Sequence, residues 1–511
     1  MTLKKLVENL EFRQVSIHKE GESPCDIEKL EIKDIKIDSR KVEEGDLFVC
    51  IAGAESDGHD YAANAVKAGA KALIIENEEK TMSKLIESGL SLNDLAVIKV
   101  EDTKLALALV SESYFDYPHK KIKSVALTGT KGKTSTSFMI KSILEKHGHK
   151  VGVIGTMGWF IGEKNEHLIN TTPDSYTINR ILNMMVEEGC DVAVMEVSSQ
   201  ALMLKRTAGI VFDIGVFTNL SPDHIGENEH KDLDDYIFWK STLFNQCKHA
   251  IANIDDECYD KMVEEGKGYD ITSFGQDEKA DLRCTDIRYV SKPGFIGVDI
   301  TLDGVVKGDF EISSPGKFSA YNAMAAIAVA SKFDVNNDDI KEALKNFHVR
   351  GRVEAVKVSD RFTLMIDYAH NAMSMESLLN TIKAYNPKRI VSLFGCGGNR
   401  SKLRRFEMGE ISGKLADFSI LTADNSRFEN VNDIIADIEV GMKKTDGEYT
   451  IIPDRKEAIK YAIETAKDGD IVLLLGKGHE DYQEIEGVRY PFDERDIIAD
   501  IMVELKKKGF K

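Results

Sequence analysis

Short apolar runs alternate with amphipathic segments along nearly the whole chain. In its first part, apolar runs at residues 47–52, 72–75 and 95–98 are separated by helix-like segments such as 61–70. Short continuous apolar runs bounded by polar residues are typical of buried strands, and longer amphipathic segments are typical of helices. Residues 30–115 are therefore predicted to form a small α/β domain.

The same alternation of strands and helices continues in two further blocks of the chain. Continuous apolar runs, as buried parallel strands require, lie at residues 151–154, 191–195, 214–218 and 250–254, and then at 363–366, 390–394, 418–422 and 471–475. A polar stretch with a proline, 117–122, and the loop 349–353 separate the blocks. We therefore predict three α/β domains, residues 1–118, 119–347 and 348–511, with helices between the strands on both faces.

Composition narrows the class of protein. The 511 residues suit three domains of ordinary size, and the net charge of −19 argues against a nucleic-acid partner, which needs a basic face. The seven cysteines lack paired spacing, as reduced cytosolic thiols do. Residues 1–10 look like an amphipathic helix without a signal-peptide core, and no apolar run reaches roughly 18 residues. We expect a soluble, unprocessed, cytoplasmic monomer without membrane insertion.

The strongest chemical signal is the segment 125–136, where an apolar strand enters a tight Gly/Thr turn before a helix expected over 137–147. Backbone N–H groups and the helix dipole at such a turn favour an anion. Lys133 can reach nucleotide phosphates, and the Thr134 hydroxyl can ligate Mg²⁺. Leu127 replaces the first glycine of the standard phosphate loop, and the alternative is a chance turn of small residues. The candidate phosphate-binding residues are Gly129, Thr130, Lys131, Gly132, Lys133, Thr134 and Ser135.

Two further strands end in polar groups. Glu196 follows the apolar run 191–195, at the place where phosphate-loop enzymes keep an acid near the metal ion. A strand-end acid alone is more often merely solvated, but the phosphate loop favours a second Mg²⁺ ligand. Residues 218–224 close the next strand and end in His224, and open α/β sheets bind ligands at such ends. A single loop histidine is more often a surface residue, yet His224 can face the same crevice.

Taken in order, the motifs of the chain resemble those of the Mur ligase family. They are Thr-Gly-Thr-Lys-Gly-Lys-Thr at 128–134, Met-Glu-Val-Ser-Ser at 195–199, Thr-Asn-Leu-Ser-Pro-Asp-His at 218–224 and Lys-Ser-Thr-Leu-Phe at 240–244. Nine further motifs resemble the branch of this family that adds the third amino acid to UDP-N-acetylmuramoyl-L-alanyl-D-glutamate. They are Ile-Asp-Ser-Arg at 37–40, Gly-Asp-Leu-Phe at 45–48, Asp-Gly-His at 57–59, Tyr-Asn at 321–322, Gly-Arg at 351–352, Asp-Tyr-Ala-His at 367–370, Phe-Gly-Cys-Gly-Gly-Asn-Arg at 394–400, Asp-Asn-Ser-Arg at 424–427 and Gly-Lys-Gly-His-Glu at 476–480. The resemblance covers nearly the whole chain. It implies a central P-loop-type ATPase domain with a parallel sheet and a Rossmann-like C-terminal domain.

The resemblance implies an ATP-dependent ligase. Such enzymes transfer the γ-phosphoryl group of ATP to a substrate carboxylate, and an amine then attacks the acyl-phosphate. The matching lysine of the family is carbamylated, which would turn Lys240 into an anion able to support a metal ion, whereas on sequence alone it would be an exposed helix lysine. The residues implied to hold the phosphates and two Mg²⁺ ions are Lys133, Thr134, Glu196, His224 and Lys240, and those implied to contact ATP are Asn322, Arg352 and Asp367.

The resemblance also places the other substrates. It puts Ile37 and Ser39 near the uridine, and it puts Asn170, Thr171, Thr172, Ser198 and Arg206 near the muramoyl-peptide. It assigns the incoming amino acid to Arg400, Asp424, Asn425, Ser426, Arg427, Gly476 and Glu480. In the diaminopimelate-adding enzymes two arginines grip a distal carboxylate that lysine lacks, and Arg400 and Arg427 match them. Leaving such donors unpaired costs on the order of a few kcal/mol, so meso-diaminopimelate is favoured.

Some positions depart from the family pattern. Ser426 stands where proline is usual, which can redirect Arg427, and Gln200 stands where histidine is usual. These departures bear on the amino-acid substrate and not on the reaction class. The alternatives are a ligase for lysine or another diamino acid, a folylpolyglutamate-synthetase-like ligase, against which the N-terminal motifs speak, and a nucleotide-dependent regulator with no use for Lys240.

Overall fold

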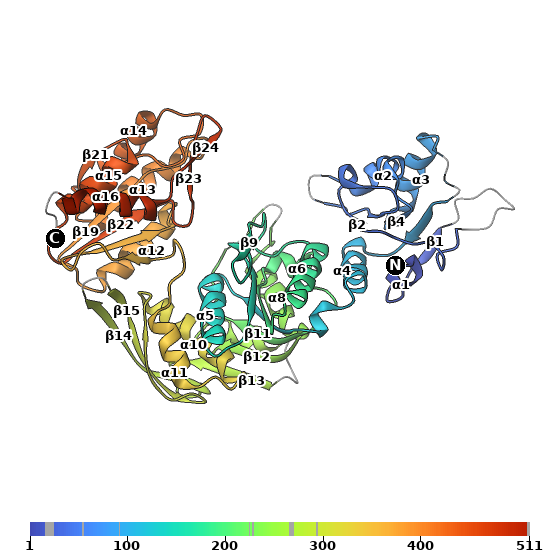
Figure 1. The fold of residues 1–511 in the computed structure, drawn as a ribbon, viewed down its shortest axis with the longest axis horizontal. Coiled ribbons are helices and arrows are strands. Elements are labelled where there is room, and N and C mark those ends of the chain that lie inside the picture. The colour runs from blue at the N-terminus through green and yellow to red at the C-terminus, as the bar shows by residue number, and fades with distance from the viewer. Residues whose placement is uncertain are drawn as a thin grey trace. The chain divides into compact units, whose positions relative to one another are not determined.

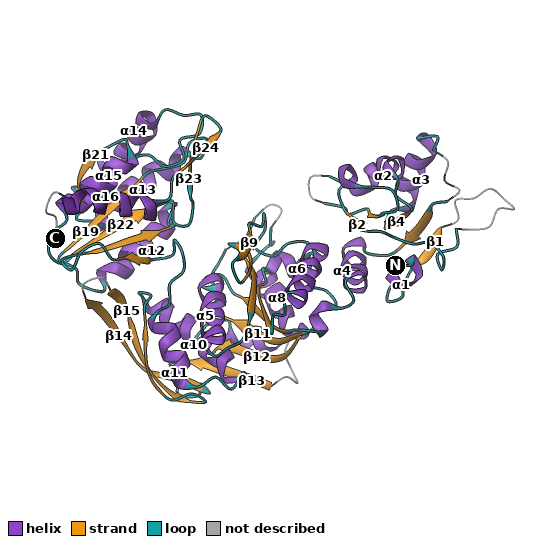
Figure 2. Ribbon diagram, viewed as in Figure 1, coloured by secondary structure: helices purple, strands orange, loops and turns teal. Residues whose placement is uncertain are grey.

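The computed structural model describes residues 1–15, 25–53, 56–90, 92, 94–223, 225–226, 229–264, 270–292 and 295–507. They divide into two compact units, unit 1 with Met1–Asp281 and Ala325–Val335, and unit 2 with Leu282–Met324 and Asn336–Lys511. Both units combine helices and strands, so the predicted α/β class is confirmed (Figure 1, Figure 2). The domain boundaries after residues 118 and 347 stay predictions.

Unit 1 begins with a five-stranded sheet in the order β1-β5-β4-β3-β2. Neighbouring strands from β2 to β5 are parallel, and β1 runs antiparallel to β5. Its elements are α1 (Leu3–Leu6), β1 (Arg13–Val15), β2 (Ile35–Lys36), η1 (Ser39–Lys41), β3 (Leu47–Val49), η2 (Gly58–Tyr61), α2 (Ala62–Ala68), β4 (Ala72–Ile75), α3 (Glu78–Glu87), β5 (Ala96–Lys99) and α4 (Thr103–Tyr114). Successive residues of β3 and β4 enter two different apolar clusters, so both faces of the sheet are covered.

The second sheet of unit 1 has the strand order β13-β12-β11-β6-β10-β7-β8-β9. The strands from β13 to β7 in this order pair in parallel, as their apolar runs predict, and β8 and β9 add antiparallel pairs at one edge. The elements are η3 (Pro118–Lys120), β6 (Lys123–Thr128), α5 (Lys133–Lys146), β7 (Val151–Gly155), β8 (Gly158–Ile161), β9 (Lys164–Glu166), α6 (Ser175–Glu187), β10 (Val192–Glu196), α7 (Ser199–Met203), β11 (Phe212–Phe217), α8 (Leu233–Ser241), η4 (Thr242–Gln246), β12 (Cys247–Asn253), α9 (Tyr259–Glu264) and β13 (Asp270–Gly275).

Unit 2 opens with an antiparallel meander where a helix–strand alternation was expected. The meander comprises β14 (Leu282–Lys292), β15 (Phe295–Gly304) and β16 (Gly308–Ile312), and the helices α10 (Lys317–Ser331) and α11 (Asn337–Lys345) follow it. Residues 325–331 of α10 belong to unit 1. The expectation was wrong here because β14 and β15 bury only part of their side chains. A half-buried strand alternates polar and apolar residues, so no continuous apolar run marks it.

The C-terminal part of unit 2 is a doubly wound sheet in the order β17-β18-β22-β19-β20-β21. All neighbours except β17 and β18 pair in parallel. Alternate residues of β18 face two clusters, Met365 toward α12, α13 and α14, and Leu364 and Ile366 toward α15 and α16. The elements are β17 (Glu354–Val356), β18 (Thr363–Asp367), α12 (Ala372–Lys383), β19 (Arg389–Phe394), α13 (Lys402–Leu415), β20 (Phe418–Leu421), α14 (Val431–Met442), β21 (Glu448–Ile451), α15 (Arg455–Thr465), β22 (Asp470–Leu475), β23 (Tyr482–Ile485), β24 (Val488–Pro491) and α16 (Glu494–Lys507).

Other expectations concern the surface and the termini. The helix expected over residues 1–10 is shorter, since α1 covers Leu3–Leu6. The seven cysteines all lie among the described residues and form no disulfide, and five of them are buried, as expected for reduced thiols. In the described ranges no helix is both long and apolar enough to cross a bilayer.

Glu112 in α4 and His119 in η3 form a buried pair in unit 1. The two residues are 4% and 6% exposed, and Nδ1 of His119 lies 3.6 Å from Oε1 of Glu112, too far for a hydrogen bond. Burial raises the pKa of Glu112 to about 7 and lowers the pKa of His119 to about 4. Both side chains are therefore neutral at slightly acidic pH.

We expect Glu112→Gln to remove a pH-dependent loss of stability. The carboxyl group titrates at a higher pH in the folded protein than in the unfolded chain, so wild-type stability falls as pH rises through this interval. The raised pKa corresponds to roughly 3 kcal/mol once the folded group ionises. Thermal unfolding midpoints at pH 5 and pH 8 measure this effect, and the variant should gain on the wild type at the higher pH. An equal difference at both pH values would exclude Glu112 as its source.

Candidate active site

The predicted site residues fall into both units, and each group is described within its own unit. The phosphate loop, Glu196, Lys240 and the residues assigned to the nucleotide sugar belong to unit 1. Asn322, Arg352 and Asp367 belong to unit 2, together with the residues assigned to the amino acid.

The phosphate loop connects the end of β6 to the start of α5. Helix α5 begins at Lys133, four residues earlier than expected, because its first turn is formed by polar residues of the loop motif. Gly129 has φ +149°, and a Cβ atom there would lie 2.1 Å from Oγ1 of Thr218, so only glycine fits. The backbone N–H of Thr130 donates to the carbonyl of Asn219 over 2.9 Å. The loop is thus held against the end of β11, as expected for adjacent parallel strands.

Glu196 ends β10, the neighbour of β6, and is 1% exposed. Its Oε2 accepts hydrogen bonds from Oγ1 of Thr134 at 3.1 Å and from Oγ1 of Thr156 at 3.0 Å. Burial raises the pKa of this carboxyl group, although Lys133 and the hydroxyl donors oppose the shift. The structure therefore brings together the hydroxyl and the carboxylate expected to act as oxygen donors for Mg²⁺.

Two lysines share one carbonyl of the loop. Nζ of Lys133 donates to the carbonyl of Gly129 over 2.7 Å, and Nζ of Lys240 donates to the same oxygen over 3.0 Å. Lys240 is 2% exposed, so the interpretation of it as an exposed helix lysine is wrong. Burial, together with the charge of Lys133, lowers the pKa of Lys240 well below its usual range. The ring of Tyr236 lies 4.6 Å from the Lys240 ammonium.

His224 lies outside the described residues, so its predicted place beside the metal ions is not assigned. Among the residues that are described, no group of three or more His, Cys, Asp or Glu side chains is placed to hold a metal ion. Thr134 and Glu196 are two oxygen donors beside the loop that the structure brings into contact.

Four of the residues assigned to the muramoyl-peptide meet at the end of β10. Thr172 donates through Oγ1 to the carbonyl of Glu196 at 2.9 Å and accepts from the backbone N–H of Ser198 at 3.0 Å. Arg206 donates to the carbonyl of Thr172 over 2.6 Å. Oγ1 of Thr171 lies 3.1 Å from Oγ1 of Thr156, which itself contacts Glu196. These side chains therefore adjoin the phosphate loop.

The remaining residues of this group lie apart. Asn170 is exposed and makes none of these contacts, whereas Ile37 and Ser39 belong to the first sheet, where Ile37 is 41% exposed. One hydrogen bond of 2.6 Å connects the two regions, from the hydroxyl of Tyr176 in α6 to Oδ1 of Asp34 just before β2.

His230 is a buried residue of this region to which the motifs gave no role. Its Nε2 lies 2.8 Å from Oγ of Ser199 in α7, and its Nδ1 lies 3.0 Å from Oδ2 of Asp235 in α8. It therefore ties the helix after Glu196 to the helix that carries Lys240. In the sequence, the signal for this contact is the spacing of five residues between His230 and Asp235 at the start of a helix. This signal is weak.

In unit 2, Asn322 lies in α10 and Asp367 ends β18. Asp367 accepts backbone hydrogen bonds from Val353 at 2.8 Å and Ala369 at 2.7 Å, and burial raises the pKa of its carboxyl group. The guanidinium of Arg352 lies 5.2 Å from the Tyr368 ring. Nδ2 of Asn322 and Nε of Arg352 are buried and have no partner among the described residues, so both keep a donor for a ligand.

The residues assigned to the amino acid lie in three connected loops. Gly398, two residues before the exposed Arg400, donates its N–H to the carbonyl of Asn425 over 2.8 Å and accepts from Nη1 of Arg427 at 2.8 Å. Nδ2 of Asn425 donates to Oε2 of Glu480 at 2.8 Å. The loops that carry Arg400, Asp424 to Arg427, and Gly476 to Glu480 therefore form one cluster, with Asp424, Asn425 and Ser426 buried.

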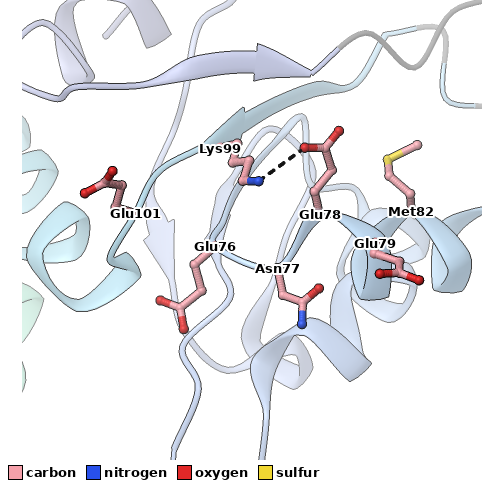
Figure 3. A pocket seen from close by; sticks show the side chains of 7 residues that line it. All are labelled: Glu76, Asn77, Glu78, Glu79, Met82, Lys99 and Glu101. Carbon is pink, nitrogen blue, oxygen red and sulfur yellow. Dashed lines mark ion pairs between the residues drawn. The ribbon is translucent and has the colours of Figure 1, made fainter.

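A pocket of about 790 Å³ lies beside the first sheet of unit 1. Glu76, Glu78, Glu79 and Glu101 line it, and Nζ of Lys99 lies 3.5 Å from Oε2 of Glu78 (Figure 3). Four carboxylates and one lysine repel a nucleotide sugar, which is itself an anion. The pocket therefore does not suit the uridine end of the expected substrate.

Comparisons with known proteins agree with the motifs. Residues 31–114 match the catalytic domain of the Mur ligase family, residues 127–330 match the Mur ligase middle domain and residues 351–478 match the Mur ligase glutamate ligase domain. UDP-N-acetylmuramoyl-L-alanyl-D-glutamate–2,6-diaminopimelate ligase from Clostridium perfringens is 37% identical over 98% of this chain and 99% of its own. The ligase of the same name from Caldanaerobacter subterraneus is 39% identical over 94% and 96%. A solved structure of a ligase of that name shares 28% identity and a TM-score of 0.70, covering 93% of this chain and 95% of the other.

Proposed function

The chain belongs to the Mur ligase family, and from this premise we propose that it adds meso-diaminopimelate to UDP-N-acetylmuramoyl-L-alanyl-D-glutamate. The reaction joins an amine of the amino acid to a carboxylate of the UDP-linked dipeptide and converts ATP to ADP and phosphate. Relatives of this name align with the chain over nearly its full length. We further propose that the protein works as a monomer in the cytoplasm.

The observation that carries the proposal is the contact between Thr134 and Glu196 under the phosphate loop. It joins a phosphate cradle to a buried carboxylate, which is the arrangement that phosphoryl transfer from a magnesium nucleotide requires. Bound Mg²⁺ would neutralise charge on the phosphates, and Thr134 and Glu196 would hold it. Lys133 would exchange the carbonyl of Gly129 for phosphate oxygens.

Asn322, Arg352 and Asp367 support nucleotide binding in unit 2. The unpartnered donors of Asn322 and Arg352 suit phosphate or ribose oxygens, because a buried donor without a partner is costly. Both oxygens of Asp367 already hold backbone N–H groups, one of them from the residue after Arg352. We infer that Asp367 also orders the arginine loop, in addition to its proposed contact with the ribose.

The environment of Lys240 supports its carbamylation. Carbon dioxide adds only to a neutral amine, forming an N–C bond and releasing one proton, and the lowered pKa of Lys240 favours that form. The product is an anion, so it would attract the ammonium of Lys133. The free ammonium of Lys240 would instead repel Lys133. An anion here would lie beside the loop carbonyl of Gly129 and could support a second metal ion, as His224 is also proposed to do.

The arginines support diaminopimelate as the amino acid. Arg427 is anchored to the loop that ends in Arg400, so two guanidinium groups belong to one cluster of loops. A distal carboxylate satisfies such donors, and lysine would leave them unpaired. The serine at 426 does not displace Arg427 from this cluster. Ser39 and Ile37 are proposed for the uridine, and the Thr172 group for the muramoyl-peptide.

Phosphate release from ATP tests the proposal. With Mg²⁺ and the UDP-linked dipeptide present, meso-diaminopimelate should stimulate release, and lysine should give a rate close to that without amino acid. Stimulation by lysine instead would keep the ligase and replace the substrate. Release that no amino acid stimulates would favour a nucleotide-dependent regulator.

A further inference from the structure

Lys477 is a fully buried cation at the centre of the amino-acid loops, and its motif gave it no role. Its Nζ lies 3.4 Å from Oδ1 of Asp424, 3.1 Å from Oδ1 of Asn425 and 3.3 Å from Oε2 of Glu480. Gly476, with φ +108°, lets the chain leave β22 in a left-handed turn just before it. The lysine thus contacts three residues that are assigned to the substrate.

The contacts of Lys477 use only one oxygen of each carboxylate. Oδ1 of Asp424 and Oε2 of Glu480 accept its hydrogen bonds. Within the described residues, Oδ2 of Asp424 and Oε1 of Glu480 accept no hydrogen bond. Each carboxylate is therefore held on one side by the lysine and keeps the other oxygen for a donor from outside.

Asn425 completes the arrangement. Its Oδ1 accepts from Nζ of Lys477 and from the backbone N–H of Glu484, so its Nδ2 is directed to Glu480. The lysine thereby fixes the direction of the amide as well as the two carboxylates. Lys477 itself is 0% exposed and cannot touch a substrate.

We propose that Lys477 is a positioning residue for the incoming amino acid, which holds Asp424 and Glu480 in place by balancing their charge. The two carboxylates and one ammonium leave a single negative charge, which matches one ammonium group of a diamino acid. This inference rests on the proposed function, since it assigns the cluster to the incoming amino acid. Without the lysine the two carboxylates would repel each other, and one would retain a proton to a higher pH.

Three titratable groups lie near these carboxylates: Tyr368, Tyr482 and Cys396. The charged groups Arg352, Arg427, Arg489 and Glu484 lie near the two tyrosines. Burial, and next to it Glu480, raises the pKa of both tyrosines, and burial raises the pKa of Cys396 to about 12. These three groups stay neutral near neutral pH, and Glu484 lies 3.4 Å from Nε of Arg427. Lys477 is the cation in direct contact with both carboxylates.

The test compares the full-length wild type with Lys477→Met and with the double variant Lys477→Met, Glu480→Gln. The kcat/KM for meso-diaminopimelate is measured from acidic to alkaline pH by phosphate release. We expect the single variant to raise the KM for diaminopimelate about tenfold or more, and to shift the acid limb of the profile upward by about one pH unit. The double variant removes one of the repelling carboxylates, so its acid limb should return toward the wild-type position while its KM stays high.

A matched control is Lys460→Met, which removes a lysine paired with Glu504 at 2.8 Å between α15 and α16. Its pH profile should equal that of the wild type. An unshifted acid limb in Lys477→Met would overturn the proposal, and so would loss of folded protein in both the single and the double variant. If the double variant folds and the single variant does not, the result would support the proposal. A wild type without diaminopimelate-dependent phosphate release would instead overturn the proposed function. The two outcomes are distinguishable, because failure of the proposed function is seen in the wild type and failure of the Lys477 proposal is seen in the variants.

Discussion

Replacing Lys240 by alanine should reduce the rate of amide formation by about a hundred- to a thousandfold, the usual loss when a group that stabilises developing charge is removed. The side chain is buried beside the phosphate loop and contacts the carbonyl of Gly129. If its carbamate supports a metal ion, alanine removes a ligand and leaves the charge of Lys133 unopposed. The rate of phosphate release with all three substrates measures the loss.

Two controls separate a carbamate from a simple cation. Lys240→Arg keeps a positive charge but cannot form the carbamate under the same conditions, so it should be as inactive as the alanine variant. Lys248→Ala removes a mostly exposed lysine paired with Asp213 and should leave the rate unchanged. Acetate or formate added to Lys240→Ala should restore part of the rate by supplying a carboxylate. An active arginine variant without such rescue would show that Lys240 acts as a cation.

Replacing Arg427 by alanine should lower kcat/KM for meso-diaminopimelate by about a hundred- to a thousandfold, because a carboxylate would lose a charged, bidentate partner. The variant should bind ATP and the UDP-linked dipeptide as before, so their KM values should change little. The kcat/KM for lysine should not fall, and discrimination between the two amino acids should disappear. Steady-state kinetics with each amino acid measure this.

The hairpin that follows supplies the control for Arg427. Arg489 lies 4.3 Å from the ring of Tyr482 in the β23–β24 hairpin, and Arg489→Ala should keep the discrimination. Arg427 also lies near Glu484 and the carbonyl of Gly398, so its loss could loosen the loops. Equal losses for both amino acids would indicate such loosening and would contradict a role in specificity.

Much of the parallel sheet architecture could be predicted because its strands are continuous apolar runs. The run 72–75 coincides with β4 to the residue, and Glu196 ends β10 where the pattern predicts. The phosphate loop could be predicted because its glycines and threonines mark a tight turn between an apolar strand and a helix, although the contact of Gly129 with Thr218 could not. The meander at 282–312 could not, because its strands are only half-buried.

Buried charges were the harder part of the site to predict. On sequence alone, Lys240 and Lys477 are ordinary lysines, and a lysine side chain is expected to be exposed to solvent. Tyr236, Ile237, Phe238 and Trp239 directly precede Lys240, and the apolar strand β22 ends just before Lys477, so the neighbours carried a signal of burial. Whether such a lysine is buried depends on contacts with distant segments, such as the hydrogen bond from Lys240 to the carbonyl of Gly129. A single sequence does not show these contacts.

The product formed from a mixture of amino acids tests the central claim most directly. The protein would be incubated with Mg²⁺, ATP, UDP-N-acetylmuramoyl-L-alanyl-D-glutamate and equal amounts of meso-diaminopimelate and lysine, and the products would be identified by mass spectrometry. The account predicts the diaminopimelate adduct almost exclusively, with one ADP and one phosphate for each amide. A lysine adduct, or ADP without any new amide, would contradict it.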